Sequence, residues 1–182
     1  NDEIKIIVRN AKRLHRLTDN ILSVTRIESK SLTLKKEVFD INLLIENVVK
    51  DEGAHIENKG VSISTKNDGQ PIEVEADRDR ISQVVSNFVH NAIKFTKAGT
   101  IEVSSRVRGS NVIVDVKDNG PGIDHQIMPL LFTKFVTKSD RGTGLGLYIC
   151  KNIIEAHEGE IGAENSLDGT GAIFSFSLPI KK

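Results

Sequence analysis

The chain has 182 residues, 38% hydrophobic and 27% charged, and its 25 basic and 25 acidic residues cancel. This composition indicates a folded globular domain and excludes a disordered chain. Zero net charge argues against recruitment to nucleic acid or to an anionic membrane. The single cysteine, Cys150, excludes an internal disulfide, and a lone thiol of this kind is typical of a buried core position. No apolar run approaches the ~20 residues that span a bilayer. We expect a cytoplasmic chain without membrane contact. Because it lacks an initiator Met, we also expect a longer parent, with any membrane anchor upstream.

A long amphipathic helix is predicted for residues 2–29. Apolar residues recur there at three- and four-residue steps, without Gly or Pro. The helix cannot bury this stripe against itself, and the next segment, "LTLKKEVFDI", alternates as a strand does. The stripe therefore packs on another chain or on a helix upstream, or it folds back onto its own domain.

The rest of the chain predicts helices and strands in alternation. Asp40 is a good N-cap for a helix over "INLLIENVVKDEGAHIENK", which Gly60 closes. Two short strands, "VSIST" and "IEVEA", precede a helix over residues 78–96 that Asp77 caps, and a hairpin of "TIEVSSRVRG" and "NVIVDVKD" follows. A short helical stretch "HQIMPLLFTKF", a helix over "TGLGLYICKNIIEAH" and the strands "EIGAENS" and "AIFSFSLPI" complete the chain. This order predicts an α/β (α+β) fold, a two-layer α/β sandwich in which three helices cover one face of a mixed sheet, preceded by the long N-terminal helix.

Three glycines, Gly142, Gly144 and Gly146, stand in "RGTGLGL" at the start of a predicted helix. Without side chains they let phosphate oxygens approach backbone N–H groups, and a helix N-terminus favours anions. The pattern is not a Walker loop, because no Gly-Lys-Ser/Thr follows, and it lacks the strand that a dinucleotide fingerprint needs. The glycines alone would also suit close helix packing.

Asn87, Asn91 and Lys94 lie at four- and three-residue steps, so they project along one side of a predicted helix. Asn is a poor helix former, and two on one face need a reason. An amide oxygen suits Mg²⁺, and a lysine one turn on could neutralise a phosphate. Alternatively, these three residues simply form a solvated polar face of the helix.

The segment "DNGPGID" follows the alternating run "VIVDV". A strand that ends in so turn-rich a segment either needs a tight reversal or brings its backbone close to a ligand.

Four segments in order, "NFVHNAIKFT", "DNGPG", "LFTKF" and "GTGLGL", resemble the N, G1, F and G2 boxes of the ATP-binding catalytic domain of sensor histidine kinases. That domain belongs to the GHKL group of ATPases and kinases, and the resemblance implies its sandwich fold, the Bergerat type. Each box alone is a weak signal, whereas four in this order are specific. Residues 1–33 resemble part of the second helix of the dimerisation and histidine phosphotransfer hairpin, and residues 34–182 resemble the ATP-binding catalytic domain.

The resemblance implies a site for ATP and Mg²⁺. Asn91 corresponds to the family's Mg²⁺ ligand, and Asn87 and Lys94 correspond to catalytic residues on the phosphate and metal side. Asp118 is expected to accept a hydrogen bond from the adenine amino group, which a merely structural turn would not need. The other implied cofactor-binding residues are Gly120, Gly122, Phe132, Phe135, Lys138, Arg141, Gly142, Thr143, Gly144, Leu145, Gly146 and Leu147.

A flexible lid is implied between the F and G2 boxes, at "TKSDR". Phe132 and Phe135 are expected to hold its base, although both would also suit a plain core. Lys138 and Arg141 are expected to contact the γ-phosphate. The glycines of "DGTG" resemble the family's last glycine box.

The implied function is that of the catalytic fragment of a two-component sensor histidine kinase. Such an enzyme transfers the γ-phosphoryl group of ATP to a histidine, for relay to an aspartate of a response regulator receiver domain. In the ATP-hydrolysing members a Glu stands in the position of Asn87 and activates water, which an amide cannot do, whereas an imidazole is itself the nucleophile.

None of the five histidines has the family's acceptor context, His15 included. We therefore expect the acceptor upstream, no autophosphorylation by this chain alone, and a homodimer through the first helix in the parent. Two alternatives stay open: an ATP-hydrolysing clamp of the same group, and an interaction module that keeps the fold without the nucleotide.

Overall fold

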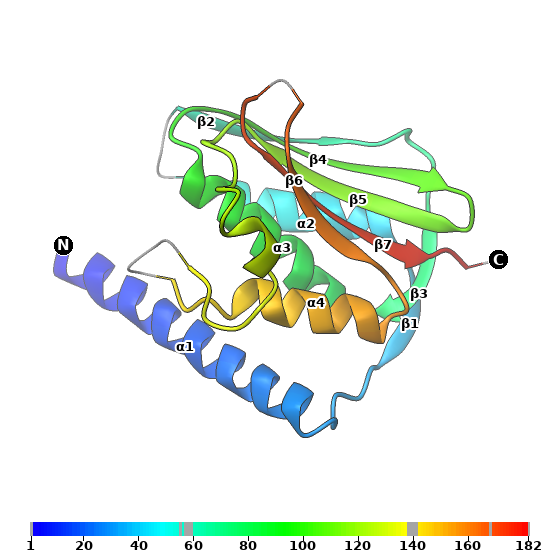
Figure 1. Ribbon diagram of the computed structural model, residues 1–182, viewed down its shortest axis with the longest axis horizontal. Helices are drawn as coiled ribbons and strands as arrows, with labels where there is room; N and C mark the ends of the chain where they lie inside the picture. The colour runs from blue at the N-terminus through cyan, green and yellow to red at the C-terminus, as the bar shows by residue number, and fades with distance from the viewer. Residues whose placement is uncertain (1, 55, 57–59, 138–141, 168, 182) are drawn as a thin grey trace.

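A mixed β-sheet forms one layer of the computed structural model (Figure 1). The structure describes residues 2–54, 56, 60–137, 142–167 and 169–181. The sheet contains β2 Val61–Lys66, β4 Gly99–Arg108, β5 Asn111–Asp118, β6 Ile161–Asn165 and β7 Ala172–Pro179. The strand order is β2, β4, β5, β7, β6, with β2 parallel to β4 and the other neighbours antiparallel. The predicted mixed sheet and the hairpin of β4 and β5 are confirmed.

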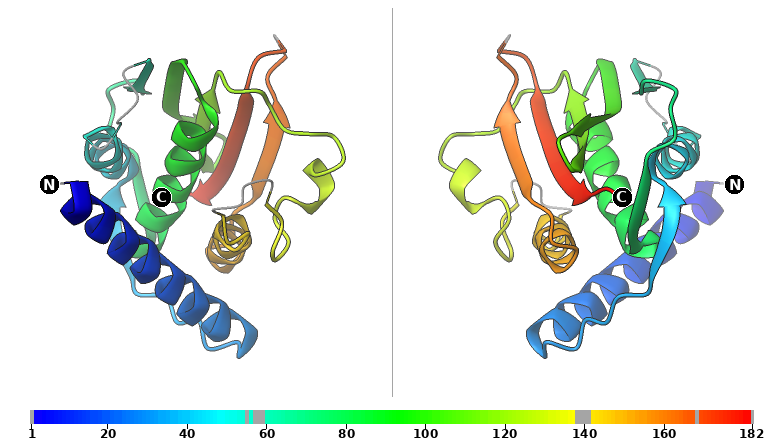
Figure 2. Two further views of the ribbon diagram at one scale, coloured as in Figure 1. Left: turned by 90° about the vertical axis from the view of Figure 1, so that its left-hand side faces the viewer. Right: turned by 90° about the vertical axis from the view of Figure 1, so that its right-hand side faces the viewer.

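Three helices cover one face of this sheet, as Figure 1 and Figure 2 show. They are α2 Ile41–Gly53, α3 Arg78–Phe95 and α4 Gly146–Ala156. The central α3 places Phe88 against Phe174 and Phe176 of β7, with ring centroids 5.4 and 6.1 Å apart. Such aromatic pairs add to the energy of apolar burial. The predicted two-layer α/β sandwich is confirmed.

Both predicted N-caps are present. The Asp40 carboxylate accepts from the N–H of Asn42 at 3.0 Å, and the Asp77 carboxylate accepts from the N–H of Arg80 at 3.2 Å. Each bond satisfies an N–H of the first turn that has no partner inside the helix. These two short local signals therefore fix where α2 and α3 begin.

The end of α2 differs from the prediction. The helix ends at Gly53, with Ala54 as its C-cap, rather than continuing to Gly60. Glycine weakens a helix because it has the most backbone freedom to lose. At Gly53 the helix also packs closely on β2, since an added Cβ would lie 3.3 Å from Ile63 Cγ2.

The prediction of one sheet was incomplete. β1 Lys36–Asp40 and β3 Glu73–Asp77 form a separate two-stranded antiparallel sheet. Each of these strands leads directly into a helix of the covering layer, so both lie beside that layer rather than within the main sheet. One isolated bridge, between Val74 and Ile180, connects β3 to the chain just after β7.

The helical stretch predicted over "HQIMPLLFTKF" is only a single 3-10 turn, η1 Met128–Leu130. Pro129 lies within it, and a proline has no N–H to donate to a longer helix. The residues that follow form turns instead.

The first helix, α1 Asp2–Glu28, lies as an arm across the helical side of the molecule (Figure 2). Near its C-terminal end Val24 and Ile27 pack against the core, whereas Ile7, Leu14 and Ile21 are exposed. The end of the helix therefore folds onto its own domain, whereas packing of the exposed part of the stripe on another chain or on an upstream helix stays a prediction. Within the described ranges, no helix is both long and apolar enough to cross a membrane.

His157 joins the end of α4 to the cap of α3. Its side chain is buried, its Nε2 accepts from the N–H of Asp77 at 2.9 Å, and its Nδ1 lies 2.7 Å from the carbonyl oxygen of Ile153. This arrangement requires a neutral ring with the proton on Nδ1. Burial lowers the pKa of His157, although the bond to Ile153 opposes that effect.

We expect this histidine to make the fold sensitive to acid. The unfolded chain binds the proton below a pKa of about 6.5, and the folded chain binds it only at lower pH. The contribution of His157 is therefore complete above pH ~6.5 and is lost as the pH falls, by at most about 1.4 kcal/mol per pH unit. Urea unfolding from pH 8 to pH 5 measures this loss. The slope of the unfolding free energy against pH should differ between the unsubstituted chain and His157→Gln, and this difference isolates the contribution of His157. Identical slopes would contradict the assignment.

Candidate functional site

Asp118 closes β5 with a buried carboxylate, 4% exposed. Its Oδ1 accepts from the N–H of Gly120 at 2.7 Å and, more weakly, from the N–H of Ala172 at 3.4 Å. Burial raises the pKa of Asp118, and the two backbone bonds partly offset that effect. All of the hydrogen bonds that the described residues give this carboxylate end on Oδ1, so Oδ2 can accept from a ligand.

The loop after Asp118 has no room for side chains at two of its glycines. A Cβ at Gly120 would lie 2.8 Å from the Asp118 carboxylate, and Gly122 has a φ of +75°. Asn119, between Asp118 and Gly120, ties the loop to β4. Its side-chain oxygen accepts from both the N–H and the hydroxyl of Thr100, at 3.0 and 2.6 Å. The loop is thus a built structure rather than a free turn.

The start of β7 lies directly against the same strand end. Gly171 has a φ of +78°, and a Cβ added there would lie 1.7 Å from the carbonyl oxygen of Asp118. Only a glycine permits this approach, which also brings the N–H of Ala172 to the carboxylate. The resemblance to a last glycine box therefore has a steric basis at Gly171.

On the facing side, α3 presents the predicted polar residues. The side-chain amide of Asn87 donates to Cys150 Sγ at 3.5 Å, and a Cβ at Gly146 would lie 3.4 Å from its oxygen. The start of α4 is therefore packed against Asn87. Asn91 is half-buried, and none of the described hydrogen bonds engages its side chain. The Lys94 ammonium lies 4.9 Å from the centre of the Phe95 ring.

Cys150 behaves as the sequence predicts, as part of the core. It is fully buried, and burial raises the pKa of its thiol to about 12, even though the Asn87 amide favours the thiolate. The thiol is therefore neutral and serves as a weak acceptor for Asn87.

The glycine segment makes a turn immediately before α4. Gly144 has a φ of +67°, and a Cβ there would lie 2.4 Å from the Phe135 backbone, whose N–H donates to the Gly144 carbonyl at 2.9 Å. The Thr143 hydroxyl accepts from the N–H of Leu145 at 3.3 Å. Because α4 begins at Gly146 without a side-chain cap, its first N–H groups can bind an anion. Gly142 is half-buried beside this turn, and Leu147 packs on the core.

The two phenylalanines of the expected F box behave differently. Phe132 packs against the core, whereas the Phe135 ring is 72% exposed and its φ is +66°. If Phe135 holds the base of the predicted lid, it does so through its backbone contact with Gly144 and not through its ring. Lys138 and Arg141, the expected γ-phosphate contacts, lie outside the described residues.

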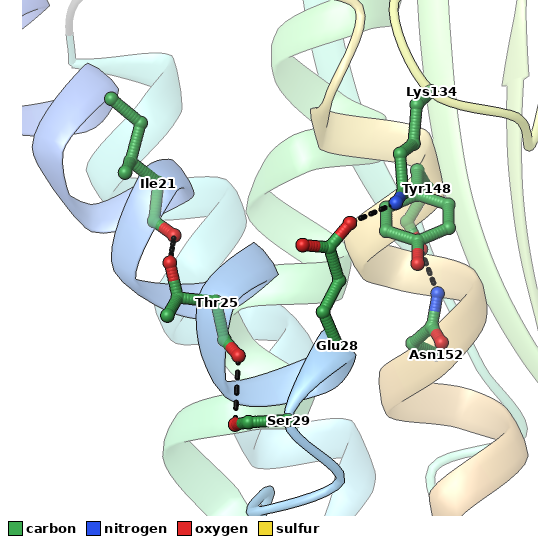
Figure 3. Close-up of polar contacts among 7 residues, drawn as sticks. All are labelled: Ile21, Thr25, Glu28, Ser29, Lys134, Tyr148 and Asn152. Atoms are coloured by element: carbon green, nitrogen blue, oxygen red, sulfur yellow. Dashed lines mark hydrogen bonds and ion pairs between the residues drawn. The ribbon is translucent and has the colours of Figure 1, made fainter.

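Lys134, between these phenylalanines, connects the loop to α1 and α4 (Figure 3). Its ammonium pairs with the Glu28 carboxylate and lies 5.1 Å from the centre of the Tyr148 ring. The ion pair with Glu28 raises the pKa of Lys134. The "LFTKF" segment, which precedes the predicted lid, is thus in contact with the N-terminal helix.

A groove of about 470 Å³ runs between α1 and α3. It is lined by Asp19 and Arg26 on one side and by Arg80 and Asn87 on the other, among others. Asp19 also binds His15, whose Nδ1 lies 2.7 Å from the Asp19 carboxylate. The groove therefore leads from α1 to the polar face of α3, while Asp118 lies outside its lining.

The sequence pattern did not single out Phe95. Its ring is 42% exposed at the end of α3, and its carbonyl oxygen would lie 3.2 Å from a Cβ at Gly120. An exposed aromatic ring beside the Asp118 loop offers a flat apolar surface. The signal available in the sequence was an aromatic residue at the last position of an amphipathic helix, which reads equally well as core.

The residues fit a nucleotide with a bound Mg²⁺. They supply a buried carboxylate acceptor, an amide oxygen and the open N-terminus of a helix, which suit a base, a hard cation and phosphates respectively. In the described part of the chain no cluster of three or more His, Cys, Asp or Glu could hold a metal. A cation would therefore rely on amide oxygen, phosphate and water, as Mg²⁺ commonly does.

The chain is similar to known proteins in both sequence and overall fold. Residues 76–182 match the family described as histidine kinase-, DNA gyrase B-, and HSP90-like ATPase. Sensor protein KdpD of Clostridium acetobutylicum is 36% identical over 180 residues, which cover 95% of this chain and 20% of that relative. The structure of full-length ShkA in complex with AMPPNP has a TM-score of 0.85 at 29% identity and covers 96% of this chain and 37% of that one.

A further solved structure contains two proteins, the histidine kinase ThkA and the response regulator protein TrrA. It matches with a TM-score of 0.76 at 32% identity and covers 100% of this chain and 51% of that one. The chain spans a fifth of the length of KdpD, so these similarities concern a part of larger proteins. The family match covers more than half of the chain and includes α3, the Asp118 loop and the glycine turn. The chain belongs to the family of histidine kinase-, DNA gyrase B-, and HSP90-like ATPases.

Proposed function

We propose that this chain is the ATP-binding catalytic region of a sensor histidine kinase, with residues 34–182 as the catalytic domain and residues 1–33 as part of the dimerisation and phosphotransfer hairpin. The observation that carries the proposal is the Asp118 carboxylate, buried at a strand end with one oxygen turned to no described donor. A structural turn would not require a buried carboxylate. The AMPPNP complex of ShkA supports the nucleotide as ligand.

The adenine base lies at the Asp118 loop in this proposal. Asp118 accepts from the exocyclic amino group, and it rejects guanine, whose carbonyl would face the carboxylate. Gly120 and Gly122 let the backbone pass close to the base, and the exposed ring of Phe95 provides an apolar surface for its face.

The phosphates lie between α3 and the start of α4. Asn91 binds Mg²⁺ through its amide oxygen, and Lys94 balances phosphate charge. Backbone N–H groups around Gly144 and Gly146 bind phosphate oxygens. When bound, Mg²⁺ supplies neutralising charge on the phosphates.

Asn87 stands where a general base would activate water, and an amide cannot take a proton. Its contacts with Cys150 and Gly146 hold it as a polar wall of the phosphate site instead. This arrangement supports transfer to an imidazole over hydrolysis. The acceptor histidine enters by way of the groove between α1 and α3, which reaches Asn87 from the side of α1.

The experiment that tests this function has two steps. Calorimetry should detect binding of ATP that is stronger with Mg²⁺ than with a chelator. Incubation with γ-labelled ATP should then leave little acid-labile label on the chain, and label should appear when a segment with an acceptor histidine is supplied. Absence of binding would favour the interaction module, and sustained release of phosphate without an acceptor would favour the ATP-hydrolysing clamp. Acid-labile label that disappears in His15→Gln would make His15, which is 79% exposed and bound to Asp19, the acceptor.

The partner in the relay is a response regulator receiver domain, as the complex of ThkA with TrrA supports. We infer that the chain acts in the cytoplasm without contacting nucleic acid or the membrane itself, and that any membrane anchor would belong to a longer parent protein. Zero net charge supports these exclusions.

Self-association through α1 is a second partner prediction. Ile7 and Leu14 lie on one face of the helix and are exposed, and such patches favour association. We expect the unsubstituted 182-residue chain to dimerise at high concentration. The variant that carries both Ile7→Glu and Leu14→Glu should be monomeric. Light scattering measures the difference. Val107→Glu is the matched control, because Val107 is a comparably exposed apolar residue on β4. A parent that stays monomeric at high concentration would contradict the prediction.

A further inference from the structure

The loop between Asp118 and Ile123 is held at both ends by side-chain hydrogen bonds to other strands. At the near end, Asn119 binds Thr100 at the start of β4. At the far end, the contact comes from Asn165, the last residue of β6, which is 42 positions further along the chain. The second contact is the more informative, because no part of the resemblance assigns a role to Asn165.

Asn165 binds both backbone groups of one loop residue. Its Oδ1 accepts from the N–H of Ile123 at 2.6 Å, and its Nδ2 donates to the carbonyl oxygen of Ile123 at 2.9 Å. A single hydrogen bond would fix a distance, whereas this pair also fixes the orientation of the backbone. The side chain is half-buried, so the two bonds are partly shielded from water.

The loop is shaped to receive this amide. A Cβ at Gly122 would lie 2.8 Å from Asn165 Oδ1, so a side chain at position 122 would compete for the same space. The hairpin that carries Asn165 also brings the N–H of Ala172 to the Asp118 carboxylate. One hairpin thus contacts the loop at its beginning and at its end.

The position of the loop determines the position of the carboxylate. The shorter of the two bonds to Asp118 Oδ1 comes from the N–H of Gly120, which lies inside the loop. A shift of the far end that carried Gly120 with it would remove the donor that orients the carboxylate. Asn165 is therefore connected to Asp118 through the loop backbone.

We propose that Asn165 is a positioning residue for base binding, which acts through the Ile123 backbone to hold the loop and the Asp118 carboxylate in the binding geometry. The inference rests on the proposed function, because it assumes that the base binds at Asp118. In this proposal Asn165 acts on the loop backbone and not on the nucleotide.

The test is a double-mutant cycle with ADP and Mg²⁺ as the probe, by calorimetry on the full chain, below the unfolding transition of every variant. Asn165→Ala should weaken ADP binding about tenfold, the loss expected for a disturbed hydrogen bond to a charged group. In the Asp118→Asn background the same change should weaken binding by less than about threefold, because residues that act through one contact are not additive. Asn165→Asp should also bind weakly, since a carboxylate cannot donate to the Ile123 carbonyl.

Asn67→Ala is the matched control. Asn67 also binds its surroundings through both ends of its amide, to the N–H of Gly69 and to Glu46, but in the turn before β3. The Asn67→Ala variant should bind ADP with the affinity of the unsubstituted chain. A parent that binds ADP and an Asn165→Ala variant with unchanged affinity would overturn the inference alone, as would a full tenfold loss in the Asp118→Asn background. A parent that does not bind ADP would overturn the proposed function, and the inference with it.

Discussion

Asp118→Asn is expected to weaken the binding of ADP by about 1.5–3 kcal/mol, or roughly 10- to 150-fold in Kd. The substitution preserves the size of the side chain, removes the charge and replaces one acceptor oxygen with an NH₂ donor. A hydrogen bond to a charged acceptor is about twice as strong as a neutral one, and the new amide could present its own NH₂ to the amino group of the base. Calorimetry with Mg·ADP measures the change.

Asp115→Asn is the control for this result. Asp115 lies on the same strand, and its substitution by Asn removes the same charge. Its carboxylate, however, pairs with Arg106 on β4, away from the loop. Its affinity for ADP should match that of the parent. If Asp118→Asn also matched the parent, the base would not bind at Asp118.

Gly171→Ala is expected to destabilise the fold by about 2–5 kcal/mol. A left-handed backbone at a residue with a side chain costs roughly 1–2 kcal/mol, and overpacking costs about 1–3 kcal/mol more. At Gly171 the added methyl group would lie 1.7 Å from the Asp118 carbonyl oxygen, so the strands must separate. Urea unfolding measures the stability.

Gly169→Ala separates the two causes. Gly169 has a φ of +76°, close to that of Gly171, yet an added Cβ there would meet nothing within 4 Å. We expect this variant to lose only the backbone contribution, about 1–2 kcal/mol. Equal losses at both positions would show that the contact with Asp118 does not matter, and the steric explanation would fail.

The sequence predicted those features that local chemistry controls. Asp40 and Asp77 mark the starts of two helices because an aspartate side chain caps the turn beside it. The glycines before α4 and the acidic end of β5 were recognisable because each lies in a short segment with an unusual composition. The end of α2 was less predictable, since Gly53 ends the helix by a balance between backbone freedom and packing on β2.

The contacts that assemble the site could not be predicted in the same way. The approach of Gly171 to Asp118 and the bonds between Asn165 and Ile123 join residues more than 40 positions apart. They depend on the register of β5, β6 and β7, which a single sequence does not specify residue by residue. The exposure of Phe135 was equally hidden, because an aromatic residue beside core residues is usually buried.

The pairing of Glu28 with Lys134 links two equilibria. The carboxylate belongs to the last turn of α1, and the ammonium belongs to the loop that reaches Gly144 through Phe135. Thermodynamic linkage is reciprocal, so a rotation of α1 that breaks the pair weakens the attachment of the loop, and an event that displaces Lys134 weakens the attachment of α1 by the same free energy. Because salt screens such exposed pairs, the coupling weakens as the ionic strength rises. A rotation of α1 therefore changes the populations of loop conformations through this pair, while Val24 and Ile27 keep the end of the helix on the core.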